Sequence, residues 1–280
     1  MSKNKGKSRR FRQSRLPVVV FITQDKGGEG KSLLAQALAE CARIHRQATG
    51  IVEVDTTGTS LKVLGSDVVG IHIDAKTARR DPGAALRALT PLYTTIARTC
   101  REGGLTIVEF GANEASRGAM WTGMIDLHEE LQELGAEVLV MMPYTRQAEA
   151  MRRGAKSATA FLDVLPYARL VLVENERDGC VSDLHPACDA IKVFNEVIVP
   201  LADKAITMKM PMIEAGSWGE FEAAGIRLVD AVTMPIDKVM LFTTLPLPEA
   251  KIVRGDVAAW CNAMFTEFEK IIDFSEVDRG

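Results

Sequence analysis

The sequence of 280 residues has no apolar stretch long enough to cross a membrane. Its longest apolar runs, at residues 18–22 and 138–143, fall far short of the roughly 20 residues that span a bilayer. The basic N-terminal residues are not followed by an apolar segment of the length found in a signal peptide. We therefore expect a soluble, cytoplasmic protein.

Cysteine and histidine are also scarce, since the sequence has five cysteines and four histidines. They include no CxxC pair and no spacing typical of metal ligands. Dispersed cysteines in odd number indicate reduced thiols that pack as small apolar side chains. We therefore predict neither disulfides nor a metal site built from these residues: Cys41, Cys100, Cys180, Cys188, Cys261, His45, His72, His128 and His185.

Acidic residues are absent from the first fifteen positions, which hold seven of the 34 Lys and Arg residues. The rest of the chain has 27 basic against 37 acidic residues, a net charge of −10. A short polar segment without apolar periodicity does not fold alone. We predict a disordered basic tail at residues 1–15 that contacts nucleic-acid phosphates, with salt-dependent affinity. The alternatives are a solubilising tail and a tail that folds back on the acidic body.

The full chain has 47% hydrophobic residues, and residues 16–280 are long enough for a large core. Short β-branched apolar runs alternate with segments of helical periodicity, which indicates a mostly parallel sheet covered on both faces. The predicted fold class is therefore α/β, with a single doubly wound sheet. Predicted strands are 16–23, 51–54, 68–73, 105–110, 136–142, 170–173, 194–199 and 205–208. Predicted helices are 33–45, 83–101 with a break at Pro91, 114–134, 146–162 and 256–274.

The most specific motif is KGGEGKS at residues 26–32, between a predicted strand and a predicted helix. Glycines let successive backbone N–H groups point at phosphate oxygens, and the N-terminus of the helix adds its positive dipole end. Lys31 would reach the β- and γ-phosphates, and the Ser32 hydroxyl would ligate Mg²⁺. The motif therefore predicts a phosphate-binding loop, although Lys26 stands where the usual pattern has its first glycine.

With this lysine, KGGEGKS resembles the deviant Walker A motif of the ParA/MinD family of ATPases, in the larger P-loop group that includes nitrogenase iron protein and dethiobiotin synthetase. The resemblance implies ATP and Mg²⁺ as cofactors and a homodimer around bound ATP. It also implies that Lys26 reaches the phosphates of the partner subunit. A cation supplied by the partner would tie hydrolysis to assembly.

Later segments resemble the family more loosely. Asp55, in VEVDTTG (52–58), falls on the acid that orients the attacking water, with Glu53 and Thr56-Thr57 as departures; Glu109 falls on the Mg²⁺-binding acid, usually aspartate. Catalytic residues are then Lys26, Lys31 and Asp55; metal-binding residues are Ser32, Asp55 and Glu109. Gly111 would sense the γ-phosphate, and Asn175 and Pro211 would flank the adenine. The implied nucleotide contacts are Gly27, Gly28, Glu29, Gly30, Lys31, Ser32, Leu33, Gly111, Asn175 and Pro211.

Relatives in this family position plasmids, chromosomes or division machinery, or serve conjugative transfer. The acids of the last predicted helix would repel anionic lipid, and its apolar stripe is typical of core packing. We therefore favour a slow ATPase with DNA and an activator protein as partners, without membrane binding. The alternatives are a metabolic ATP-dependent ligase of the dethiobiotin-synthetase type and a weakly hydrolysing, nucleotide-gated binding module.

Overall fold

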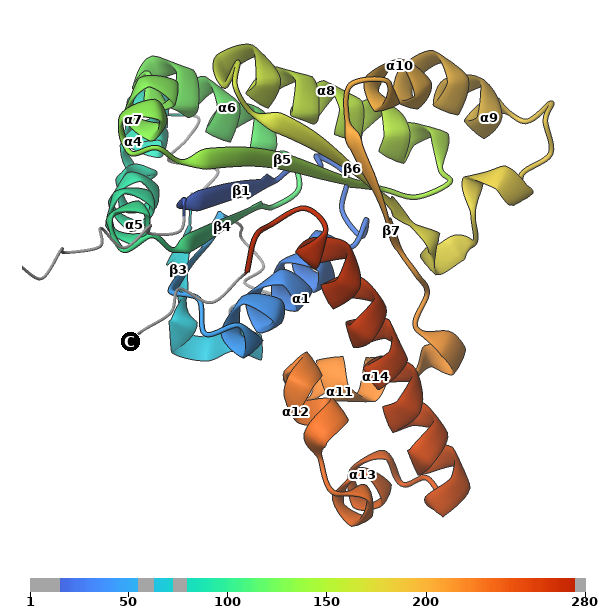
Figure 1. Cartoon of the computed structure of the whole chain (residues 1–280). Helices are drawn as coiled ribbons and strands as arrows, with labels where there is room; N and C mark the ends of the chain where they lie inside the picture. Colours follow the sequence, from blue (N-terminus) through green and yellow to red (C-terminus); the bar gives the residue numbers. More distant parts are fainter. Residues whose placement is uncertain (1–15, 55–62, 73–79, 275–280) are drawn as a thin grey trace, which may run out of the picture.

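The computed structural model describes residues 16–54, 63–72 and 80–274. Seven strands form one sheet in the order β3-β2-β4-β1-β5-β6-β7, and every neighbouring pair is parallel. The predicted fold class, an α/β chain with one doubly wound parallel sheet, is confirmed (Figure 1). The strands are β1 (Val18–Ile22), β2 (Thr49–Val54), β3 (Val68–Ile71), β4 (Leu105–Phe110), β5 (Glu137–Tyr144), β6 (Arg169–Asn175) and β7 (Ile206–Met210).

Helices cover both faces of the sheet. One face packs against α1 (Lys31–Ile44) and α14 (Leu247–Glu269), together with α11 (Gly219–Ala223), α12 (Leu228–Thr233) and α13 (Ile236–Thr243). The other face packs against α4 (Pro82–Arg87), α5 (Thr90–Arg101), α6 (Ala115–Met124), α7 (Leu127–Glu133), α8 (Ala148–Val164), α9 (Asp189–Val193) and α10 (Val199–Ala202). Short 3-10 helices are η1 (Gly65–Asp67), η2 (Glu176–Asp178), η3 (Val181–Asp183) and η5 (Glu214–Gly216), and η4 (Phe194–Ile198) is a π-helix.

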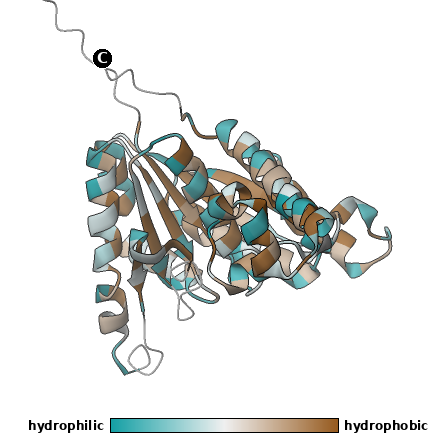
Figure 2. Cartoon of the chain, turned by 90° about the horizontal axis from the view of Figure 1, so that it is seen from below, coloured by the Kyte–Doolittle hydropathy of each residue, from teal (hydrophilic) through white to brown (hydrophobic). Residues whose placement is uncertain are grey.

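The central strands form where the sequence is apolar without alternation. Every residue of β1 and β4 is buried, as expected for parallel strands that are covered on both faces. Figure 2 shows brown strands of the sheet and, beside the sheet, helices that carry both brown and teal residues. On the side of the sheet that α8 covers, the rings of Phe21, Phe110 and Phe161 pack together. The ring centroid of Phe161 lies 5.3 Å from that of Phe21 and 5.1 Å from that of Phe110. This aromatic cluster fastens α8 to the middle of the sheet.

Two predicted elements are wrong. Residues 194–199 form no strand but a helical segment made of η4 and the start of α10, because the apolar residues of this region recur at helical spacing and pack on the core as Val193, Val197 and Leu201. The predicted helix at 114–134 is divided into α6 and α7, since Asp126 adopts a left-handed φ of 48°. At the end of α1, Ile44 is 51% exposed, although it continues the apolar spacing of the buried Leu34, Leu38 and Cys41.

The last helix begins earlier than predicted, at Leu247 instead of residue 256. Its predicted apolar stripe is core: Trp260, Met264 and Phe268 are buried, and the Trp260 indole donates a hydrogen bond to the Pro211 carbonyl at 2.7 Å. Among the described helices, none combines the length and the hydropathy that a bilayer crossing requires.

We predict that Phe161→Ala lowers the free energy of unfolding by about 3–5 kcal/mol, because it leaves a cavity between α8 and the sheet. Urea denaturation measures this value. Leu241→Ala is the control, since Leu241 is 83% exposed and its truncation should change stability by less than about 0.5 kcal/mol. Equal effects of the two substitutions would contradict the role of the aromatic cluster.

Candidate functional site

The segment that the sequence predicts to be a phosphate loop connects the end of β1 directly to the start of α1. Gly28 and Gly30 have φ angles of 79° and 90°, in the left-handed region that favours glycine. Gly30 is also tightly enclosed: a Cβ there would come within 2.5 Å of Asn175 Nδ2 and 2.6 Å of Met210 Cε. Because α1 begins at the next residue, Lys31, the unpaired N–H groups of its first turn adjoin the loop.

Gln24 anchors the loop to the neighbouring strand. Its buried amide nitrogen donates to the carbonyls of Pro143 and Ala150, at 2.8 and 3.0 Å. Its amide oxygen accepts a bond from the backbone N–H of Lys26 at 3.1 Å. One side chain therefore joins the phosphate loop, the end of β5 and the start of α8. Our sequence analysis missed this residue, and its position directly after a buried strand was the available signal.

The two lysines of the motif lie in different environments. Lys31 is buried, and its Nζ donates to the Lys26 carbonyl at 3.2 Å, so it closes back over the loop. The Lys26 side chain is 26% exposed and forms an ion pair with the buried carboxylate of Glu29. Lys26 Nζ also donates to Gln147 Oε1 at 2.9 Å. The loop thus keeps one cation inside and presents the other near its surface.

Carboxylates gather beside the first turn of α1. Glu53 on β2 and Glu109 on β4 are register partners, so their side chains project from the same face of the sheet, and both are buried. The Ser32 hydroxyl donates to Glu109 Oε1 at 2.5 Å. A hydroxyl bonded to a buried carboxylate, with a second buried carboxylate on the neighbouring strand, offers oxygen donors of the kind that Mg²⁺ prefers. These residues therefore fit a divalent cation, and Ser32 and Glu109 are two of the three residues predicted to bind it.

Two other predicted residues, Gly111 and Asp55, come directly after β4 and β2 in the sequence. Gly111 comes directly after β4, and its N–H donates to the Val54 carbonyl at 2.9 Å. A contact of this amide with a γ-phosphate would have to replace that bond. Asp55 and the neighbouring Thr56-Thr57 lie outside the described residues. The described strand β2 ends at Val54.

Asn175 supports the loop from behind. Its amide nitrogen donates to the Glu29 carbonyl at 3.1 Å, and its amide oxygen accepts from the Arg177 N–H at 3.1 Å. The side chain is 4% exposed, so the predicted contact with adenine would require the amide to exchange a partner. The Arg177 guanidinium donates to the Gly28 carbonyl. Arg177 is a further loop contact that our sequence analysis missed, two residues beyond the asparagine that it singled out.

The remaining predicted nucleotide contacts lie around the same loop. Leu33, in the first turn of α1, packs partly buried against the core. Pro211 directly follows β7 and accepts the indole bond of Trp260. Gly27 has open space, since a Cβ there would be 3.9 Å from its nearest neighbour, Ala112 Cβ. The structure thus brings the predicted residues that it describes to one edge of the sheet, where ligands bind in open parallel sheets.

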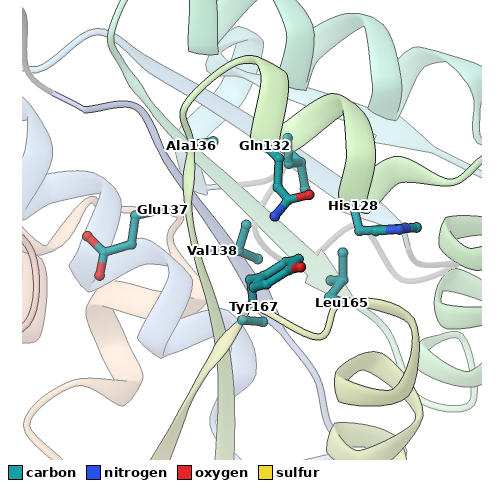
Figure 3. A pocket seen from close by; sticks show the side chains of 9 residues that line it. His128, Gln132, Ala136, Glu137, Val138, Leu165 and Tyr167 are labelled. Atoms are coloured by element: carbon teal, nitrogen blue, oxygen red, sulfur yellow. The ribbon is translucent and has the colours of Figure 1, made fainter.

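A pocket lies at the opposite edge, around the start of β5. Its volume of about 80 Å³ is well below the roughly 300–1,000 Å³ of small-molecule sites. Figure 3 shows the side chains that surround it, which include His128, Gln132, Leu165 and Tyr167. This pocket is separate from the phosphate loop and too small for a nucleotide.

No protein-family model matches the chain, and no curated protein matches it. Similar solved structures include the MinD cell division protein of Aquifex aeolicus (12% identity, 88% of this chain and 97% of that chain, TM-score 0.43) and apo McdA of Cyanothece (12% identity, 87% and 99%, TM-score 0.48). FtsY of Mycoplasma mycoides is also similar (15% identity, 71% and 61%, TM-score 0.39). These scores are low, and the fold assignment above rests on the strand order of this chain.

We predict that Gly30→Ala lowers the free energy of unfolding by about 1–3 kcal/mol, because alanine is strained at a left-handed φ and its Cβ would collide with Asn175 and Met210. Urea denaturation measures the change. Gly27→Ala is the matched control in the same loop, where a Cβ has room and φ is not left-handed. Equal losses in both variants would contradict the assigned loop geometry.

Proposed function

We propose that the protein is a Mg²⁺-dependent ATPase that dimerises around ATP and acts as a nucleotide switch in DNA partitioning, positioning or conjugative transfer. The observation that carries the proposal is the start of α1. There a loop with two left-handed glycines, Gly28 and Gly30, adjoins a helix N-terminus, the buried Lys31 and the Ser32–Glu109 hydrogen bond. This arrangement offers N–H groups and a cation to phosphate oxygens, with oxygen ligands for a metal beside them.

In this proposal the phosphates of ATP lie along the loop, and the Lys31 ammonium leaves the Lys26 carbonyl to meet their negative charge. Ser32 and Glu109 would hold Mg²⁺, which neutralises charge on the phosphate oxygens when bound. Asp55, which follows β2 in the sequence, would orient the attacking water. Asn175 is the last residue of β6 and Pro211 directly follows β7, and in this proposal the two residues would flank the adenine.

Lys26 would supply the link between nucleotide and dimer. Its ammonium lies near the surface of the loop and forms a pair with Glu29 within its own chain. The Glu29 side chain is only 1% exposed, and a buried charge that loses its partner is costly. If Lys26 turns to a phosphate group of the partner subunit on dimer formation, its attraction to that phosphate has to compensate for the loss of the pair with Glu29.

The cellular role is the part of the proposal that depends on the family resemblance and on charge. The predicted basic tail at residues 1–15 lies outside the described residues. A second basic group lies on α8, where Arg152 and Arg153 are exposed. These two basic segments are the proposed DNA contacts, and an activator protein is the proposed second partner.

We predict that Lys31→Ala abolishes ATP binding, whereas Lys26→Ala still binds ATP but neither dimerises nor hydrolyses it. Lys31 would contact phosphates of its own subunit and Lys26 those of the partner. Light scattering with Mg²⁺–ATP and Mg²⁺–ADP measures the mass, and calorimetry measures nucleotide binding. Retention of both dimerisation and hydrolysis in Lys26→Ala would rule out the contact with the partner's phosphates.

Measurements of phosphate release and of mass in solution distinguish the proposed ATPase from its alternatives. Multiple-turnover phosphate release that is lost in Asp55→Ala excludes a binding module that does not hydrolyse. A mass that stays the same with ATP and ADP would favour that module or a metabolic ligase, and phosphate release that needs a small-molecule acceptor would identify the ligase.

Deletion of residues 1–15 should weaken binding to double-stranded DNA and flatten its salt dependence. The slope of log affinity against log salt should fall by roughly 0.9 for each DNA phosphate that the tail neutralises in the full-length protein. Fluorescence anisotropy at several salt concentrations measures both quantities. Unchanged affinity and slope would show that the tail does not contact DNA.

A further inference from the structure

Three potential metal ligands meet where the end of α1 contacts α14, on the face of the sheet shown below it in Figure 1. They are Cys41 and His45 in the last turn of α1 and its cap, and Glu269, the last residue of α14. One ligand atom of each residue lies within 4.8 Å of the others. Throughout the described ranges 16–54, 63–72 and 80–274, no other group of three His, Cys, Asp or Glu residues meets this condition.

The local geometry follows from helix periodicity. Cys41 and His45 are four residues apart, so they project from the same side of α1. Glu269 approaches from the neighbouring helix, and His45 Nε2 lies 2.9 Å from Glu269 Oε1. The imidazole also stacks on Phe274, with ring centroids 4.9 Å apart and planes at 17°. The ring is therefore held with a nitrogen toward the carboxylate.

The three side chains differ in exposure in a way that suits an ion entering from solvent. Cys41 is buried, whereas the side chains of His45 and Glu269 are 29% and 49% exposed. Burial and the nearby Glu269 carboxylate raise the pKa of the Cys41 thiol to about 12. Without a cation, the thiol is thus a protonated core group. A partly exposed His–Glu contact by itself contributes little to the free energy of folding. Such a contact also does not require a cysteine thiol beside it.

Thiolate, imidazole and carboxylate together are ligands of Zn²⁺, at bond lengths of about 2.0–2.3 Å. Around a tetrahedral ion such ligand atoms lie roughly 3–4 Å apart, so the existing separations need only side-chain adjustments. Mg²⁺ and Ca²⁺ prefer oxygen ligands alone. The donor set therefore selects a zinc-like ion over the cations expected at the phosphate loop.

The spacing of cysteine and histidine in the sequence predicts no metal site, but the fold brings Glu269 to Cys41 and His45. We propose that these three residues bind one Zn²⁺ ion, with water in the fourth position, and that this ion clamps the end of α1 to the end of α14. The site is independent of the proposed nucleotide function, since its residues lie at the opposite end of α1 from Lys31. Because the clamp exists only in the folded chain, bound Zn²⁺ stabilises the native state.

The test uses full-length protein stripped of metal, in excess Mg²⁺ so that the phosphate-loop carboxylates do not compete for Zn²⁺. Calorimetry should show one equivalent of Zn²⁺ bound. Co²⁺ used as a spectroscopic probe should give a thiolate-to-metal absorption band that is absent in Cys41→Ser. Affinity for Zn²⁺ should fall at least about tenfold in His45→Ala and in Glu269→Gln. Zn²⁺ should raise the thermal unfolding midpoint of the wild type by several degrees and leave that of Cys41→Ser unchanged.

Cys100→Ser is the matched control. Cys100 is also buried in a helix, and burial raises its pKa to about 11, but it belongs to no cluster of ligands in the described structure. This variant should keep wild-type Zn²⁺ affinity. His128→Ala, which removes a histidine from the pocket at the start of β5, should also keep it.

Absence of saturable Zn²⁺ binding by the wild type would overturn the proposal. So would wild-type affinity in Glu269→Gln, a near-isosteric change at a half-exposed side chain that leaves the fold intact by circular dichroism. Equal loss of affinity in Cys41→Ser and Cys100→Ser would show that the thiols act only through core packing, and it would also overturn the assigned site.

Discussion

The structure depends on the burial of β1 between β4 and β5, where it is parallel to both neighbours. The loop that follows β1 therefore lies at the carboxyl ends of the parallel strands, between the ends of β4 and β5. Gln24 then joins that chain to β5, and Gly30 fits against Asn175 and Met210 from β6 and β7. The phosphate loop is therefore shaped by three other strands as well as by its own glycines.

Charge is divided between two halves of this edge. On the side of the loop lie three cationic side chains. Lys31 donates a hydrogen bond to the Lys26 carbonyl, Lys26 forms an ion pair with Glu29, and Arg177 donates to the Gly28 carbonyl. The strand side has the buried carboxylates Glu53 and Glu109. In the proposed complex, phosphate oxygens would meet the first half and a divalent cation the second. Such a division would let one site bind both an anion and a cation.

Helix α1 connects this edge to the rest of the core. Its first turn holds Lys31 and Ser32, its middle residues Leu34 and Leu38 are buried against the sheet, and its end meets α14 at Cys41 and His45. A rigid helix transmits a constraint from one end to the other. The proposed zinc clamp would thus hold the same helix that presents two of the proposed nucleotide ligands, while remaining chemically separate from them.

By itself, the sequence determined the features that depend on neighbouring residues. Unbroken apolar runs such as Val18–Ile22 suit only strands buried on both faces, and the spacing of glycine and lysine in residues 26–32 indicates a phosphate loop. Tertiary structure decided which distant groups meet. Gln24 contacts Pro143, Glu53 lies beside Glu109, and His45 reaches Glu269 across 224 positions of sequence. Such outcomes depend on register and on how helices pack against the sheet, which no local pattern encodes.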